Sequence, residues 1–139
     1  MKTAKGLVDY AKAQLGRPYW FGTFGQIATD KLYKYNKGRL PSYYTAADFP
    51  RQYGQRVHDC AGLIKGYLWS DTPESAPQYA KDYPDISADQ MRAQCTETGD
   101  ISTLPEIPGV LLFYSGHVGV YIGNGQAIEA RGHAYGVVQ

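Results

Sequence analysis

The sequence predicts a single α+β domain with helices in its first part and strands at its end. In the first part, apolar residues recur every three to four positions, which is typical of amphipathic helices. After about position 110 the period changes to two, which is typical of strands. A chain of 139 residues has the length of one domain and buries roughly 68% of the surface that its unfolded form exposes. We therefore expect residues 1–139 to form one domain in which N-terminal helices pack on a small antiparallel sheet.

The first predicted helix covers residues 3–15. Its apolar side chains fall on one face, Thr3 can cap its start, and Gly16 is placed to end it. Residues 16–25 then contain glycines, Pro18 and aromatic side chains, which interrupt helical geometry. We expect this segment to be a structured loop.

A second clear helix is predicted over residues 60–69, where apolar residues share one face and Cys60 stands at the N-terminus. Ser87 and Gln90 have the spacing of a capping box, which predicts the start of another helix that runs to about Cys95.

Three stretches carry weaker signals. Residues 29–36 and 45–53 are weaker helical segments, and Pro50 is expected to kink or end the second of them. Three prolines make residues 70–86 mostly irregular.

The last part of the chain contains four predicted strands, at residues 110–114, 117–122, 126–130 and 136–138. The loop at residues 123–125 sets the register, and a change of one residue inverts every side chain. A two-residue loop would place Glu129 and Arg131 among the valines of the facing strand. A three-residue loop keeps one face apolar, with the pairs Val118–Ala130, Val120–Ile128 and Ile122–Gln126. This predicted register sets Glu129 opposite Gly119 and diagonal to His117, about 7–8 Å between Cβ atoms and within reach of a hydrogen bond.

The residues Cys60, His117 and Glu129 form a set suited to nucleophilic catalysis. Unpaired N–H groups at a helix N-terminus and a nearby imidazole favour a thiolate, so the sequence predicts a lowered pKa for Cys60. His117 would carry the proton, and Glu129 would orient the imidazole and stabilise its charged form. The backbone N–H of Cys60 and the hydroxyl of Tyr19 are candidate donors to an oxyanion.

Composition argues against several other classes of function. Lys and Arg total 14 against 13 Asp and Glu, without a run of one sign, so no nucleic-acid or anionic-membrane surface is expected. Residues 1–15 contain no uninterrupted apolar run, so neither a signal peptide nor membrane insertion is expected. Cys60 and Cys95 are expected to be free thiols, with a structural role for Cys95. His58 and His133 are expected on the surface or in loops rather than in a metal site.

Four short motifs follow one another along the chain: Gly16-Arg17-Pro18-Tyr19, Asp59-Cys60-Ala61-Gly62-Leu63, Pro108-Gly109 and the hairpin from Gly116 to Gly125. Together they resemble the NlpC-type family of papain-like cell-wall peptidases, over roughly residues 3–138. The resemblance implies a papain-like fold with the nucleophile at a helix N-terminus. It assigns Cys60 as the nucleophile, His117 as the base and Glu129 as the third polar residue. It also implies that Tyr19 faces the thiol and that Asp59 helps to hold a free amine of the substrate.

The chain departs from the family pattern at three positions. Ala61 stands where a serine is usual, Val110 where an acidic residue often follows Pro-Gly, and Glu129 where His, Asn or Gln is common. Residues 26–58 are longer than a minimal member requires, and we expect this insertion to supply specificity, since inserted loops build binding surfaces on a fixed scaffold.

The resemblance implies hydrolysis of an amide bond in the peptide part of bacterial peptidoglycan, of the γ-D-glutamyl–diamino acid type. The expected partner is the stem peptide, contacted by Asp59, Trp20 and Gly119, with no cofactor and no metal. We expect a monomer that acts on the cell wall, either as a holin-released phage lysin or as a domain of a larger exported protein, and the strand pattern at Gln139 is compatible with a truncated C-terminus. The alternatives are an N-acetylmuramoyl-L-alanine amidase, an acyl or peptidyl transferase with the same thiol, and an inactive wall-binding domain.

Overall fold

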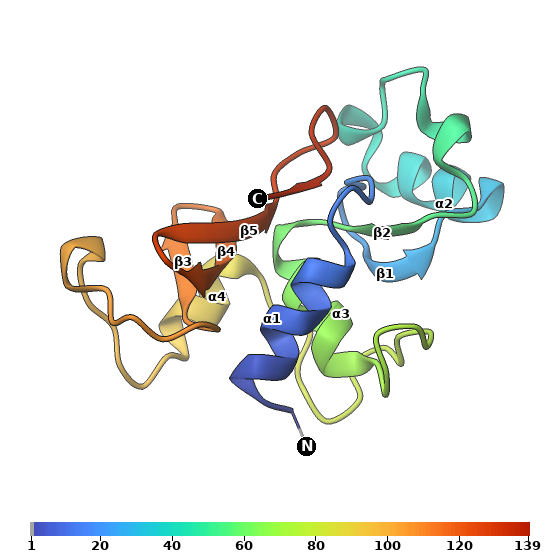
Figure 1. Ribbon diagram of the computed structural model, residues 1–139. Coiled ribbons are helices and arrows are strands. Elements are labelled where there is room, and N and C mark those ends of the chain that lie inside the picture. The colour runs from blue at the N-terminus through green and yellow to red at the C-terminus, as the bar shows by residue number, and fades with distance from the viewer. Residues whose placement is uncertain (1) are drawn as a thin grey trace.

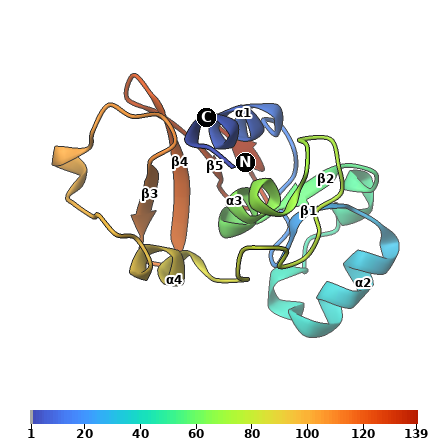
Figure 2. The ribbon, with the colours of Figure 1, turned by 90° about the horizontal axis from the view of Figure 1, so that it is seen from below.

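The computed structural model, which describes residues 2–139, places two central helices between two small antiparallel sheets (Figures 1 and 2). The central helices are α1 (Ala4–Ala13) and α3 (Cys60–Trp69). Within the described residues, one sheet pairs β1 (Phe24–Ile27) with β2 (Arg56–His58), and the other has the order β3 (Leu111–Tyr114), β4 (His117–Gly123), β5 (Gln126–Ala130) and β6 (Val137–Val138). The predicted α+β class is confirmed.

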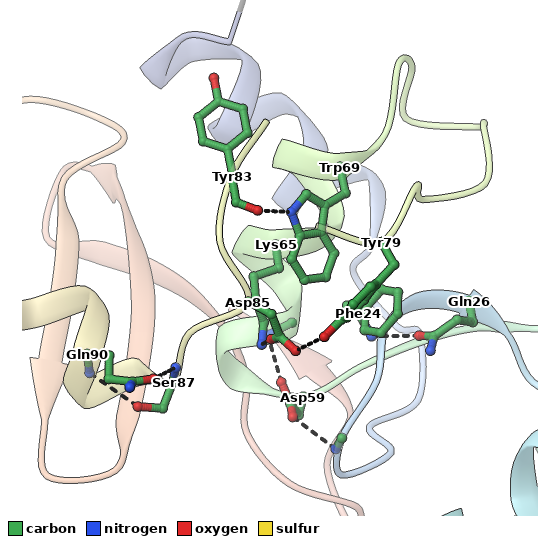
Figure 3. A network of polar contacts seen from close by, with 12 residues as sticks. Phe24, Gln26, Asp59, Lys65, Trp69, Tyr79, Tyr83, Asp85, Ser87 and Gln90 are labelled. Atoms are coloured by element: carbon green, nitrogen blue, oxygen red, sulfur yellow. Dashed lines mark hydrogen bonds and ion pairs between the residues drawn. The ribbon is translucent and has the colours of Figure 1, made fainter. Parts of the chain in front are cut away.

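Capping residues begin the helices where the sequence predicts. Thr3 accepts a backbone N–H from the first turn of α1. Ser87 and Gln90 exchange the two bonds of a capping box at the start of α4 (Ala88–Ala93), which ends just before the predicted Cys95 (Figure 3). None of the helices within residues 2–139 is both long enough and apolar enough to cross a membrane.

The insertion, residues 26–58, differs most from its prediction. It contains α2 (Asp30–Arg39), which extends the predicted helix at its C-terminal end, and 3₁₀ turns at Pro41–Tyr43 and Phe49–Gln52. The helix predicted over residues 45–53 is wrong, because only the turn containing Pro50 forms; proline has no N–H to continue a helical ladder. Strands β1 and β2, which lie at the two ends of the insertion, were not predicted.

A cluster of buried side chains, the Trp20 cluster, joins the insertion to the loop that follows α1. Its fully buried members are Trp20, Ala28, Tyr44, Phe49 and Val57. The Trp20 ring meets its aromatic neighbours edge to face, for example Phe49 at 5.3 Å between centroids. Edge-to-face contacts add to the free energy gained from burying apolar area, so this cluster fixes the insertion against the body of the domain.

The β4–β5 hairpin combines two registers. Near its open end Val120 pairs with Ile128 and Tyr121 with Ala127, as the three-residue loop predicts. A bulge then shifts the pairing, so that Gly123 rather than Ile122 faces Gln126. The predicted pair of Ile122 with Gln126 is therefore wrong, because the turn itself has two residues, Asn124 and Gly125, both with positive φ. The predicted apolar face is confirmed, since its members Val118, Val120, Ile128 and Ala130 are buried against the helices.

His58 lies at the end of β2 and is fully buried, which corrects its prediction as a surface or loop residue. Its Nε2 is 2.6 Å from the Tyr10 hydroxyl, and its Nδ1 has no partner among residues 2–139. Burial lowers the pKa of His58 to about 3, and the positive charge of Arg56 acts in the same direction. The ring is therefore neutral at neutral pH.

We expect His58→Gln to make the free energy of unfolding less sensitive to acid. Histidine in an unfolded chain has a pKa of about 6.5, so between pH 6.5 and 3 the unfolded state binds a proton that the folded state does not. Stability therefore falls as the pH is lowered through this window, by about 3 kcal/mol at pH 4. Glutamine can still accept a hydrogen bond from Tyr10 but does not titrate. Urea unfolding at pH 7 and pH 4 gives the loss of unfolding free energy between the two pH values for the parent and for His58→Gln. Equal losses in the two proteins would contradict the burial of a neutral imidazole.

Candidate active site

The N-terminus of α3 is fixed by Asp59, which caps the helix and also holds the preceding loop. Its Oδ1 accepts the N–H of Gly62 at 2.6 Å, and its Oδ2 accepts the N–H of Gly22 at 2.9 Å (Figure 3). A Cβ at position 62 would lie 1.8 Å from the carbonyl oxygen of Thr23, so only glycine allows this approach. The Asp-Cys-x-Gly motif therefore places Cys60 at the first position of a helix packed closely on the loop.

The Cys60 thiol meets the start of β4. Its Sγ is 3.8 Å from the carbonyl oxygen of Gly116, and the backbone N–H of Val118 also acts on the sulfur. These two residues flank His117 in the chain. Asp89 of α4 accepts the N–H of Gly116 at 2.9 Å and so fixes the turn that carries the histidine. The half-buried thiol and the imidazole thus come from separate elements that meet at one point.

His117 and Glu129 form a hydrogen-bonded pair across the hairpin. The His117 Nε2 donates to Oε2 of Glu129 at 2.7 Å, and the two side chains are 12% and 32% exposed. A Cβ at position 119 would lie 3.4 Å from the Cβ of Glu129, so glycine leaves the carboxylate room. Because the carboxylate engages Nε2, Nδ1 is the ring nitrogen that this bond leaves available.

The pKa of Cys60 is raised rather than lowered, which corrects the prediction from the helix N-terminus. Burial of the thiol is the main cause, and the negative charge of Asp59 adds to it. Backbone N–H groups, including that of Val118, oppose this shift but do not outweigh it. The folded environment of Cys60 therefore favours the thiol over the thiolate.

Tyr19 is half-buried, and its hydroxyl lies close enough to Asp59 and Cys60 for their charges to act on it. Burial raises the pKa of its hydroxyl above the ordinary range, and the charges of Asp59 and Cys60 act in the same direction. The hydroxyl consequently stays protonated and can donate a hydrogen bond.

Two predicted substrate contacts are not placed to touch a substrate. The Trp20 ring is completely buried, and its Nε1 donates to Gln52 at 2.7 Å within the insertion. Gly119 is buried beneath Glu129. Trp20 anchors the insertion and Gly119 makes room for the carboxylate, so both act on the site through other residues. The third predicted contact, Asp59, precedes Cys60 in the chain and uses each carboxylate oxygen to accept a backbone N–H.

Other candidate residues stand apart from this arrangement. Cys95 lies after α4, where its half-buried Sγ contacts the carbonyl oxygen of Met91 at 3.4 Å. Within residues 2–139, three or more His, Cys, Asp or Glu side chains nowhere gather closely enough to hold a metal ion. Sequence reasoning missed the contact of His133 with Asp48, because no local pattern links residues 85 positions apart.

We expect Asp59→Asn to lower the pH midpoint for alkylation of Cys60 by iodoacetamide. The substitution removes the charge that helps to raise the thiol pKa, while the asparagine oxygen can still accept the N–H of Gly62. Peptide mapping across a pH series gives the midpoint. Asp9→Asn, which removes the same charge from the exposed side of α1, is the control. A midpoint that did not move in Asp59→Asn would show that its charge does not reach the thiol.

Comparison with known proteins agrees with this geometry. The family model described as the NlpC/P60 family matches residues 33–139, more than half of the chain. The matched region includes Cys60, His117 and Glu129, whereas Tyr19 precedes it. No curated protein matches the chain.

Proposed function

Because the chain belongs to the NlpC/P60 family of cell-wall cysteine peptidases, we propose that it hydrolyses an amide bond in the peptide part of bacterial peptidoglycan with Cys60 as the nucleophile. The observation that carries this proposal is the 2.7 Å hydrogen bond between His117 and Glu129 across the β4–β5 hairpin, because His117 begins the strand whose start meets the thiol. Such a pair can take a proton from the thiol and hold the resulting imidazolium.

In the first half of the reaction the Cys60 sulfur attacks the carbonyl carbon of the amide while its proton passes to Nδ1 of His117. A C–S bond forms, and the carbonyl π electrons move to oxygen to give a tetrahedral oxyanion. The backbone N–H of Cys60, free of a helical partner at the start of α3, and the Tyr19 hydroxyl donate to this oxygen. The C–N bond then breaks, and the amine leaves with the proton from His117.

In the second half water hydrolyses the thioester. His117 removes a proton from the water, and the oxygen attacks the thioester carbon. The C–S bond breaks, the sulfur regains its proton from His117, and a carboxylic acid is released. Glu129 serves both halves, because its bond to Nε2–H keeps Nδ1 directed to the reaction and stabilises the positive charge on the ring.

For the substrate, we propose the bond between the γ-carboxyl of D-glutamate and a diamino acid in the stem peptide. Asp59 supports a peptide with a free amino end, since its carboxylate lies next to the nucleophile and each oxygen keeps a lone pair beyond its backbone bond. Burial raises the pKa of Asp59. A bound ammonium group would therefore favour the charged carboxylate and gain a strong ion pair.

Digestion of purified muropeptides, followed by mass spectrometry of the products, tests this function. Cleavage between D-glutamate and the diamino acid is the expected result, and Cys60→Ala is the negative control. Release of the whole stem peptide from the glycan would identify an amidase instead. Intact muropeptides after long incubation would indicate a binding domain and overturn the proposal.

We expect Tyr19→Phe to lower kcat by about 10²-fold, which is the effect of losing one oxyanion donor. The change removes a hydroxyl and leaves the ring, so packing is preserved. Steady-state kinetics on a defined muropeptide measure the loss, which should fall on kcat more than on KM. Tyr43→Phe removes a hydroxyl from an exposed ring of the insertion and is the matched control. Equal kcat values for the Tyr19 variant and the parent would assign Tyr19 to packing alone.

A further inference from the structure

The ring of His133 joins the candidate oxyanion residue to the insertion. Its Nδ1 is 3.1 Å from the backbone carbonyl oxygen of Tyr19, and its Nε2 is 2.5 Å from Oδ1 of Asp48. The ring also stacks on Phe49 of the Trp20 cluster, with 4.2 Å between centroids and 19° between planes. One side chain in the loop after β5 thus contacts both the loop that carries Tyr19 and the insertion.

The two partners of His133 decide its protonation. A backbone carbonyl and an ionised carboxylate can only accept hydrogen bonds, so each ring nitrogen must donate. Both nitrogens donate only in the imidazolium form, whose charge Asp48 balances. His133 lowers the pKa of Asp48, chiefly through this hydrogen bond, so the carboxylate stays ionised opposite the ring.

We propose that His133, held as an imidazolium by Asp48, is a positioning residue that sets the Tyr19 hydroxyl at the oxyanion. This inference rests on the proposed function, in which Tyr19 is an oxyanion donor. His133 does not touch the reacting atoms in this scheme; it acts through the backbone of Tyr19.

Backbone hydrogen bonds hold the chain on both sides of Tyr19. The N–H of Gly16 donates to the carbonyl of Val137 at 3.0 Å, and the N–H of Val137 donates to the carbonyl of Arg17 at 2.8 Å. The N–H of Trp20 donates to the carbonyl of His58 at 3.2 Å. The segment is therefore fixed on both sides of Tyr19, and His133 completes the hold at Tyr19 itself. A displacement of about 1 Å at a catalytic group can reduce the rate about 10²-fold.

The other charges near the ring are accounted for by their own contacts. Arg51, in the same turn as Phe49, acts on Asp48 and favours its ionised form. Arg131, on the loop of His133, lies over the ring of Tyr135 at 4.2 Å. Asp48 is therefore the acid that balances the His133 charge in this arrangement.

Two substitutions separate positioning from packing. His133→Phe keeps an aromatic ring for Phe49 but removes both hydrogen bonds. We expect kcat to fall about 10-fold or more, with KM little changed. Asp48→Asn can keep both bonds, because the amide N–H donates to Nε2 of a neutral ring whose Nδ1–H still donates to Tyr19. Because this variant keeps the bond to Tyr19 but loses the charge that holds the ring, we expect its kcat to fall, and by less than the roughly 10-fold loss in His133→Phe.

A double-mutant cycle with Tyr19→Phe links the effect to the hydroxyl. If His133 acts through Tyr19, then His133→Phe should cost little further activity once the hydroxyl is absent. If Tyr19→Phe alone leaves kcat unchanged, the donor role fails and the positioning role fails with it. If Tyr19→Phe is impaired while His133→Phe matches the parent, only the positioning role of His133 is overturned. Additive losses in the double variant would also overturn it.

The protonation of His133 can be measured without any activity assay. ¹⁵N NMR of the histidine rings at neutral pH should show two protonated nitrogens for His133 in the parent and one in Asp48→Asn. The His133→Phe spectrum assigns the signal by its loss. A parent ring with a single protonated nitrogen would overturn the imidazolium, whatever the kinetic result.

Discussion

Cys60→Ala is expected to abolish amide hydrolysis, a loss of roughly 10⁶-fold in kcat for an enzyme whose nucleophile is removed. In the proposed reaction the thiol forms the covalent bond to the substrate, and within residues 2–139 no other cysteine lies beside the His117–Glu129 pair. The fold should survive, because the helix start is fixed by Asp59 and Gly62 rather than by the thiol. Muropeptide digestion with product analysis measures the loss.

Cys95→Ala is the matched control for this variant. Its thiol contacts the carbonyl oxygen of Met91 in α4, away from the His117–Glu129 pair, so full activity is expected. Measurable turnover in Cys60→Ala, with Cys95 still present, would contradict the mechanism in which the Cys60 thiol is the nucleophile.

Substitutions of Glu129 are expected to give the next largest effect, graded by what the new side chain can do. Glu129→Ala leaves Nε2 of His117 without its partner and should lower kcat by about 10²-fold or more. Glu129→Gln can still accept from Nε2–H but has lost the charge, so its activity should lie between that of the alanine variant and the parent. Steady-state kinetics on one muropeptide rank the three proteins.

The ranking of the two Glu129 variants by kcat separates orientation of the His117 ring from a general charge effect. Equal losses in Gln and Ala would indicate a charge effect rather than orientation of the ring. Glu97→Gln removes an exposed carboxylate outside the hairpin and controls for the change in net charge. Its kcat should equal that of the parent. Parental activity in both Glu129 variants would make this residue a solvated strand carboxylate.

Elements with a strong periodic pattern and a capping signal could be predicted from the sequence. Helices α1 and α3 and the strands of the β3–β6 sheet follow from apolar spacing, and the face shared by His117 and Glu129 follows from excluding charge from the apolar side. Strands β1 and β2 could not be predicted, because Phe24–Ile27 contains glycine and glutamine and Arg56–His58 has a single apolar residue, so neither shows a run of strand-forming apolar residues. They form through pairing across the insertion, which is a tertiary effect.

The environment of the site residues was less accessible to sequence reasoning. From the sequence, Trp20 could equally be a surface or a core residue. The cluster that buries it is assembled from segments far apart in the chain. The direction of the Cys60 pKa shift depends on two opposing effects: burial of the sulfur raises the pKa, and nearby backbone N–H groups lower it. That balance exists only in the folded chain.

The bulge in the β4–β5 hairpin makes the tip of the hairpin a site for engineering. It absorbs the difference between the three-residue register at the His117–Glu129 end and the two-residue turn at Asn124 and Gly125. A change in turn length can therefore be taken up on the tip side of the bulge, leaving the alignment at the open end unchanged. We expect a foreign peptide inserted between Asn124 and Gly125, such as an affinity tag or a segment that targets a chosen cell wall, to leave the alignment of His117 and Glu129 unchanged.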